Sequence, residues 1–365
     1  MKVCVLTFGW PPNCGGSGFY AYDLVQGLVK NGHSVTVYTN KSPNLSKKNL
    51  RIIHVNSRSP HVLFYNHNLK KYEQQIIDAK FDVILHNEIA GVTLSKAFFH
   101  SQKNLMAYHH QANQEFTLSL FRKFKLGIVQ IMQSRMVKKT DALTFLAKPS
   151  FDRAIDKYNL TKPTFILPCV VTLPAQRSAN AAKHKVVSIF YPAGASDNFE
   201  RKGFVEFIPV IKRLLGRGLK FKVVVSGGNK KVIEKLSNLL AKDGINNVEF
   251  TPNLTFSKIL ELYQLADLVV FTSKFEGFGR PFIEALSSGK PLIAHDVGIA
   301  SEVINNGQNG FIVSDATELE KILAKLIPNQ AHLNKMGESA RQTDLSRFSE
   351  TAVIRKFEKM VKAIS

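Results

Sequence analysis

The sequence has few cysteines and no long apolar run, and each shortage excludes a class of protein. Its 365 residues include three cysteines, Cys4, Cys14 and Cys169, whose spacing fits neither a zinc site nor a disulfide-rich scaffold. No apolar run reaches the roughly 18 residues of a membrane-spanning helix. The first predicted strand begins at about Lys2, so we expect no signal peptide and a cytoplasmic protein.

Acidic residues are also scarce: 28 Asp and Glu stand against 49 Lys and Arg, which gives a net charge of +21. This excess predicts an anionic partner, which is a membrane lipid, a nucleic acid or an acidic glycan, unless the charge serves only solubility or the field of a diphosphate site. Residues 117–139 interleave apolar and basic side chains, a pattern typical of a helix on a membrane surface. We therefore expect contact with an anionic membrane, at its inner face, and no nucleic acid. The alternative is an ordinary packed helix with a solvated basic face.

The length suits two domains, and both halves alternate apolar runs with helical patterns. Strands are expected at residues 3–8, 34–39, 51–55, 81–85, 105–108, 142–146 and 164–167, then at 186–193, 222–226, 247–250, 268–271, 291–294 and 311–313. The fold class is therefore α/β, with two doubly wound sheets. We predict domains at residues 1–168 and 186–346, a linker at 169–185, and a final amphipathic helix within 347–365.

Glycines and polar residues follow several strands of the first half, where open α/β sheets bind ligands. Gly15 and Gly16 follow the first strand and allow a ligand to approach the backbone, unless they serve only a tight turn. His109 and His110 follow a later strand, and the sequence does not separate them; His109 is preferred for the site. His110, together with His86 and Glu88 at another strand end, is a weaker candidate for contact with an acceptor.

The most informative stretch is Ser273 to Leu286. Its pattern predicts a glycine loop that follows a buried strand and leads into a helix. The glycines and the positive end of the helix favour phosphate. Glu276 lies in the loop and Glu284 about one turn into the helix, and carboxylates beside a phosphate site bind hydroxyl groups. A capping role for Glu284 is the alternative, but Pro281 stands where a capping box needs Ser or Thr. The pattern indicates a nucleotide-sugar site.

The string Glu276-Gly-Phe-Gly-x-Pro-x-x-Glu284-Ala closely resembles the E-x7-E region of glycosyltransferase family four. Further matches follow at Ser288-Gly289-x-Pro291 and Glu302-x4-Gly307-x-x-Gly310. Members of this family are retaining glycosyltransferases of GT-B fold. The resemblance implies two Rossmann-like domains facing a central cleft, an acceptor-side first domain, and a last helix that crosses back to it.

The resemblance also implies roles for residues. Glu284 is expected to bind ribose hydroxyls, Glu276 the transferred sugar, and His109 the same sugar. Lys202-Gly203 matches the family's Lys-Gly, whereas the partner arginine is assigned to Arg201 because Gly194 is followed by Ala195. The expected catalytic set is His109, Arg201, Lys202 and Glu276. The expected donor-binding set is Gly15, Gly16, Arg201, Lys202, Thr251, Pro252, Glu276, Gly277, Phe278, Gly279, Arg280 and Glu284.

Breaking a glycosidic bond to a nucleoside diphosphate leaves negative charge on the phosphate, which preorganised cations stabilise. The sequence has no Asp-x-Asp element, so we expect no obligatory metal, and no cofactor besides the nucleotide-sugar co-substrate. The resulting hypothesis is metal-independent, front-face transfer from a UDP- or GDP-sugar to a lipid-linked or polysaccharide acceptor. The alternatives are an epimerase or a phosphorylase of the same fold, or a non-catalytic basic module that binds membranes or nucleic acid.

Overall fold

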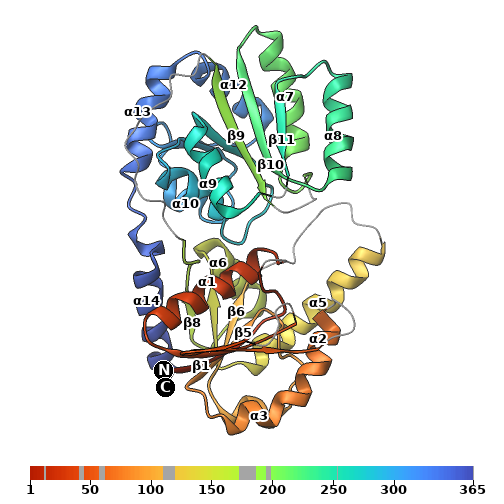
Figure 1. Ribbon diagram of the computed structural model, residues 1–365, viewed down its shortest axis with the longest axis vertical. Coiled ribbons are helices and arrows are strands. Elements are labelled where there is room, and N and C mark those ends of the chain that lie inside the picture. The colour runs from red at the N-terminus through yellow and green to blue at the C-terminus, as the bar shows by residue number, and fades with distance from the viewer. Residues whose placement is uncertain are drawn as a thin grey trace. The chain divides into compact units, whose positions relative to one another are not determined.

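The computed structural model divides the chain into two compact units (Figure 1). Unit 1 comprises Met1–Val170 and Ser346–Ser365, and unit 2 comprises Val171–Leu345. The structure describes residues 1–11, 14–40, 45–56, 62–109, 120–171, 186–194, 199–252 and 254–364. His110, most of the predicted linker and the first residues of the basic segment 117–139 lie outside the described residues.

Unit 1 contains an eight-stranded sheet of order β3-β4-β2-β1-β5-β6-β7-β8. The strands are β1 (Lys2–Leu6), β2 (Ser34–Thr39), β3 (Leu45–Lys47), β4 (Leu50–His54), β5 (Val83–Asn87), β6 (Asn104–Tyr108), β7 (Ala142–Phe145) and β8 (Thr164–Ile166). All pairs are parallel except β3 with β4. The helices are α1 (Gly16–Lys30), α2 (Val62–Leu69), α3 (Glu73–Asp78), α4 (Lys96–Ser101), α5 (Leu120–Lys139), α6 (Lys148–Tyr158) and α14 (Glu350–Ala363), with short 3-10 turns η1 (Lys70–Tyr72) and η2 (Ser346–Phe348).

Unit 2 contains a six-stranded parallel sheet of order β11-β10-β9-β12-β13-β14. The strands are β9 (Val187–Gly194), β10 (Phe221–Gly227), β11 (Val248–Thr251), β12 (Leu268–Phe271), β13 (Leu292–Ala294) and β14 (Gly310–Ile312). The helices are α7 (Phe204–Gly216), α8 (Lys230–Lys242), α9 (Phe256–Leu265), α10 (Arg280–Ser287), α11 (Ala300–Val303), α12 (Ala316–Leu326) and α13 (Gln330–Arg341). The prediction of two doubly wound α/β sheets is confirmed.

Helices cover both faces of the second sheet, which explains why its inner strands β12 and β13 are apolar throughout. Neighbouring residues of β9 point to opposite faces: the ring of Tyr191 stacks on Phe207 of α7, whereas Phe190 contacts Tyr263 of α9. On the α9 side, Phe271 meets an aromatic ring of α10 at 5.3 Å between centroids. The strand ends are thereby held between two layers of helices.

The last helix, α14, belongs to unit 1 and packs against α1 (Figure 1). A Cβ atom on Gly27 of α1 would lie 3.0 Å from Ile354 of α14, so the glycine permits the close approach. Glu350 pairs with Lys30 at 3.0 Å, and Glu358 contacts His33 at 2.8 Å. The C-terminal helix is therefore an integral part of the N-terminal unit.

Candidate functional site

The predicted cationic and acidic residues of unit 2 follow two neighbouring strands, β9 and β12. The strand order reverses between these two, since β10 lies on the other side of β9. Arg201 and Lys202 come after β9 and before α7, and Glu276 comes after β12 and before α10. Open α/β sheets bind their ligands at such a point of reversal, at the carboxyl ends of the strands.

The structure brings these three side chains together at a single oxygen. Lys202 Nζ donates a hydrogen bond to Glu276 Oε1 at 2.8 Å, and Arg201 NH1 lies 3.3 Å from the same atom. The hydroxyl of Ser273, which the sequence did not identify, also donates to it at 2.8 Å. The three charged side chains are between 11% and 18% exposed, so the cluster is shielded from water without being sealed.

The cluster carries a net positive charge. Burial alone would raise the pKa of Glu276, but Lys202 and Arg201 hold that pKa below its ordinary value. The carboxyl group is therefore ionised at neutral pH, and two cations face one anion. The remaining positive charge makes this corner attractive to a phosphate group.

The backbone that carries Lys202 is fixed against the end of β12. Gly203 adopts a left-handed conformation (φ 81°), and a Cβ atom there would lie 1.9 Å from the carbonyl oxygen of Thr272. Only glycine permits this approach. The hydroxyl of Tyr191 donates to the carbonyl of Lys202 at 2.5 Å, and the amide of Lys274 donates to that of Arg201 at 2.9 Å.

Glu284 lies in a second group of contacts on α10. Gly279 (φ 90°) precedes the helix, and no acidic residue stands in its first turn to offset the positive helix end. The carboxylate of Glu284 is buried; its Oε2 accepts a hydrogen bond from Tyr263 at 3.0 Å, and its Oε1 lies 3.5 Å from Arg280 Nε. Burial, with the nearby Glu284 charge, holds the pKa of Tyr263 far above its ordinary value, so the phenol stays a donor.

Thr251 and Pro252, which belong to the expected donor-binding set, lie at the end of the edge strand β11. The Thr251 hydroxyl donates to the carbonyl of Val225 at 3.2 Å. The structure brings them into neither of the two contact groups.

In unit 1, His109 directly follows β6 and is buried. Its Nε2 lies 2.7 Å from Oδ1 of Asn87, and its ring meets Tyr20 edge to face at 4.7 Å. Burial lowers the pKa of His109 to about 3, so the imidazole is neutral at physiological pH. A neutral ring can exchange hydrogen bonds with a sugar but adds no positive charge beside a phosphate.

The side chain of His86 is buried in unit 1, whereas its strand-end position predicted a side chain open to an acceptor. It is fully buried; Nδ1 lies 2.8 Å from the carbonyl oxygen of Ala90, and Nε2 lies 2.8 Å from Oδ1 of Asn104. Both ring nitrogens are thus engaged by the chain itself. Glu88, two residues on, is partly exposed and adopts a left-handed conformation (φ 59°) that is uncommon for a residue other than glycine.

Gly15 and Gly16 stand at the start of α1, with Gly15 at the N-cap position. A Cβ atom on either glycine would meet nothing within 4 Å, and the φ of Gly15 is −85°. Neither packing within the described residues nor backbone conformation demands glycine there. Gly18 differs, since its Cβ would lie 2.5 Å from that of Cys14.

Comparison with known proteins identifies the family. The sequence model described as "Glycosyltransferase Family 4" matches residues 14–173, and that described as "Glycosyl transferases group 1" matches residues 185–343. The chain is a family-four glycosyltransferase. The second match contains the whole Arg201–Lys202–Glu276 cluster and Glu284.

Relatives resemble this glycosyltransferase along nearly its whole length. An MMP alpha-(1->4)-mannosyltransferase of Mycolicibacterium hassiacum is 21% identical over 97% of the chain and 96% of the relative. Among solved structures, sucrose-phosphate synthase of Thermosynechococcus elongatus has a TM-score of 0.81 at 16% identity, covering 100% and 98% of the two chains. Anabaena Alr3699/HepE in complex with UDP and glucose has a TM-score of 0.78 at 17% identity and covers 100% of both. These similarities show the GT-B fold.

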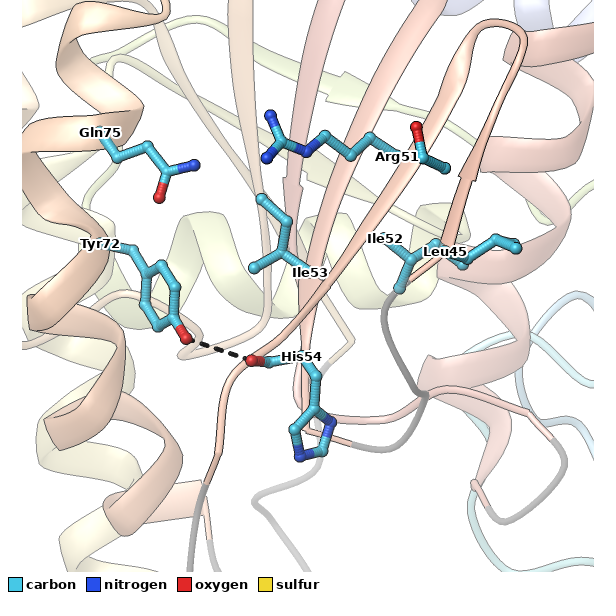
Figure 2. Close-up of a pocket in the computed structure, with 8 residues that line it drawn as sticks. Leu45, Arg51, Ile52, Ile53, His54, Tyr72 and Gln75 are labelled. Carbon is cyan, nitrogen blue, oxygen red and sulfur yellow. Dashed lines mark hydrogen bonds between the residues drawn. The ribbon is translucent and has the colours of Figure 1, made fainter.

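A cavity of about 450 Å³ in unit 1 of the glycosyltransferase contains none of the predicted site residues (Figure 2). Side chains of β4 face Tyr72 and Gln75 across it, and the Tyr72 hydroxyl donates to the carbonyl of His54 at 3.2 Å (Figure 2). Its lining consists of Leu45, Ser46, Arg51, Ile52, Ile53, His54, Tyr72 and Gln75. It lacks an acidic group and differs in this from the cluster of unit 2.

Proposed function

We propose that this glycosyltransferase moves a sugar from a nucleoside diphosphate sugar to a glycan or lipid-linked acceptor, with retention of anomeric configuration. The observation that carries the proposal is the cationic cluster of Arg201 and Lys202, ordered by Glu276 at the strand reversal of unit 2. That a protein of the same fold was solved with UDP and glucose supports a nucleotide-sugar donor.

In this proposal the diphosphate of the donor lies against Arg201 and Lys202. Because both cations are held in place before the reaction, they stabilise the charge that develops on the leaving phosphate without a reorganisation cost. They supply the charge that a metal ion supplies in other transferases. Glu284, with one oxygen held by Tyr263, receives the ribose hydroxyls.

Glu276 is assigned to the hydroxyls of the transferred sugar. In the described part of the chain its three hydrogen-bond donors all contact Oε1, so Oε2 is the oxygen that accepts from a sugar. A carboxylate neutralised by two cations is a weak nucleophile. We therefore assign no covalent intermediate to Glu276, and the leaving phosphate takes the proton of the acceptor hydroxyl in a front-face displacement.

Donor binding is tested by thermal shift with UDP-, GDP- and ADP-sugars, because a ligand that binds only the folded state stabilises it. Turnover with the donor so identified is then compared in Lys202→Ala and Lys212→Ala. Lys212 is the matched control, an exposed lysine of the same unit that pairs with Asp243 at 2.6 Å. We expect kcat to fall about 100- to 1,000-fold in Lys202→Ala and to stay unchanged in the control. Equal turnover in both variants contradicts the proposal.

The two alternative enzyme activities, phosphorylase and epimerase, give different products. A phosphorylase requires inorganic phosphate, and an epimerase changes the donor without an acceptor. Product analysis by NMR in the presence and absence of phosphate and acceptor separates them, and the anomeric coupling constant shows retention or inversion. A non-catalytic module would not consume any donor, even slowly by hydrolysis.

We also propose an anionic membrane surface as the partner that the basic charge serves. On α2, Leu63 and Phe64 are 38% and 52% exposed, and the exposed Lys70 and Lys71 follow on η1. On α5, Ile131 is 58% exposed and begins a stripe that continues through Arg135 and Lys138. Apolar tips beside basic side chains suit the boundary between lipid headgroups and acyl chains.

Lys139 lies within electrostatic reach of both Arg135 on α5 and Lys70 on η1. Burial lowers the pKa of Lys139, and the charges of Arg135 and Lys70 lower it further against the opposing effect of Glu73. Lys139 itself is tied to the carbonyls of Val92 and Leu94, both at 2.9 Å. No helix among the described residues is long and apolar enough to cross a bilayer, so the contact proposed is peripheral.

Co-sedimentation with vesicles of phosphatidylserine and phosphatidylcholine tests this partner. The double variant Phe64→Ser with Ile131→Ser is expected to lose most binding at low salt. Leu265→Ser is the control, because Leu265 is 56% exposed but lies in unit 2. The absence of binding by the unmodified protein, or equal losses in both variants, contradicts the proposal.

A further inference from the structure

Asn87 lies at the end of β5, beside His109 at the end of β6, and every hydrogen-bonding atom of its side chain is engaged. Nδ2 lies 3.0 Å from the carbonyl oxygen of Ser17 and 2.9 Å from the hydroxyl oxygen of Thr7. Oδ1 lies 2.7 Å from Nε2 of His109. Asn87 is 5% exposed and His109 7%, so water does not substitute for these contacts.

The orientation of this amide follows from its partners. A backbone carbonyl only accepts, so the atom that faces Ser17 must be the NH₂ group. The Thr7 hydroxyl donates to the carbonyl of Gly9 at 2.9 Å, so its lone pair receives the second N–H of Asn87. Both donors of the amide are thereby used, and the oxygen is left to face His109.

The orientation of Asn87 in turn fixes the proton of His109. An amide oxygen only accepts, so Nε2 of His109 must carry the hydrogen. Nδ1 of a neutral imidazole is then an acceptor with a lone pair. Burial lowers the pKa of His109 to about 3, which keeps the ring neutral, and its titratable neighbour Tyr20 on α1 has a pKa raised by burial.

We propose that Asn87 is a positioning residue that locks His109 in the Nε2–H tautomer, so that Nδ1 accepts a hydrogen bond from a substrate hydroxyl. The inference rests on the proposed function for the presence of His109 in the site. It adds a constraint on the substrate, because the group opposite Nδ1 must donate. A sugar with a free hydroxyl satisfies it, whereas a methyl ether, a deoxy sugar or a uronate carboxylate at that position leaves the nitrogen unpaired or repelled.

The tautomer is measured directly by two-bond proton–nitrogen NMR on protein labelled at histidine, without any substrate. The signal absent from His109→Gln identifies the residue among the 11 histidines. We expect a protonated Nε2 and an unprotonated Nδ1 at pH 7, unchanged down to pH 5. A proton on Nδ1, or an imidazolium at pH 7, overturns the proposal.

The role in turnover is tested with Asn87→Asp. A carboxylate beside Nε2–H raises the pKa of His109 by about 1 to 3 units, and protonation removes the Nδ1 lone pair. The variant also loses the N–H donors to Ser17 and Thr7, a loss that Asn104→Asp reproduces at the carbonyls of Phe99 and Gln102. Asn87→Asp should therefore gain an acid limb in kcat/KM, falling about tenfold per pH unit below the raised pKa, which the unmodified enzyme lacks.

Asn104→Asp is the matched control, because Asn104 places its Oδ1 2.8 Å from Nε2 of the other buried strand-end histidine, His86. It should retain the pH profile of the unmodified enzyme. The same new limb in both variants, or in neither, overturns the positioning role. If the NMR result holds but His109→Gln turns over donor normally, the tautomer stands and the assignment of His109 to the site fails.

Discussion

The charge cluster of unit 2 can be tested without knowing the substrate, by a double-mutant cycle on Lys202 and Glu276. Lys202→Met and Glu276→Gln each remove one charge with little change in shape. At 2.8 Å and an effective dielectric constant of about 20, the gross attraction is about 6 kcal/mol. Desolvation offsets roughly half of it because both side chains are largely buried. We expect a coupling of about 2–3 kcal/mol in the free energy of unfolding of unit 2.

The coupling also has a predictable pH dependence. The pKa of Glu276 is lowered in the folded protein, so its ionised form contributes stability above the pKa it has when unfolded, about 4.3. That contribution is lost as pH falls through the lower folded pKa. The coupling should thus be constant between pH 7 and pH 5 and decline only below about pH 4.

Native-state hydrogen exchange of the amides of β12 measures this free energy within unit 2, independently of the unfolding of unit 1. Lys258→Met with Glu261→Gln is the control cycle, because that pair at 3.1 Å is more than half exposed. The coupling free energy of this exposed pair should be less than about 1 kcal/mol. A Lys202–Glu276 coupling no larger than the control, or one that persists undiminished at pH 3, refutes the reasoning.

Three further outcomes are expected. Glu284→Ala should weaken binding of the donor nucleotide by about tenfold or more. Tyr263→Phe should weaken the same binding by a smaller factor, because it removes the hydrogen bond that the phenol donates to Glu284. Isothermal calorimetry with the nucleotide measures both affinities. Gly203→Ala should destabilise unit 2 by more than about 2 kcal/mol, since its Cβ would collide with a backbone carbonyl. Gly216→Ala should leave the stability unchanged or raise it, because a Cβ at this position of α7 meets no atom within 4 Å. Urea unfolding measures both changes. Transfer should be unaffected by EDTA, because Lys202 and its neighbour supply the positive charge; a rate restored only by added divalent ions would contradict this.

The alternation of strands and helices was predictable because parallel strands buried on both faces give continuous apolar runs. The range Ser34–Thr39 matches β2 as predicted. The three-residue edge strand Leu45–Lys47 was missed, because one apolar residue followed by two exposed polar ones has no strand periodicity. Helix α1 begins at Gly16, and two glycines in its first turn, Gly16 and Gly18, have low helix propensity, so the sequence pattern does not show where this helix starts.

The candidate site was only partly predictable, because a sequence pattern shows which residues are close along the chain but not which distant residues contact them. The loop around Glu276 is a local pattern, so its residue types were readable from spacing. The hydrogen bond from Ser273 to Glu276 lies within the same loop, but no spacing rule indicates which loop hydroxyl makes it. The partners Tyr263 and Asn87 come from tertiary contacts, and Tyr263 lies on another helix from the Glu284 it contacts. His86 was placed at a strand end correctly, but the sequence does not tell that its side chain turns into the core.

The packing of α14 on α1 has a consequence for the order in which the polypeptide is made. Residues 1–170 leave the ribosome long before Glu350 and Ile354 are synthesised. The surface of α1 around Gly27, which α14 covers in the folded protein, is therefore exposed to solvent while all of unit 2 is being translated. The first unit to be translated is thus the last to be finished. A circular permutant that begins at Ser346 and joins α14 to β1 would make that unit continuous along the chain, and it should reach protease resistance earlier during synthesis.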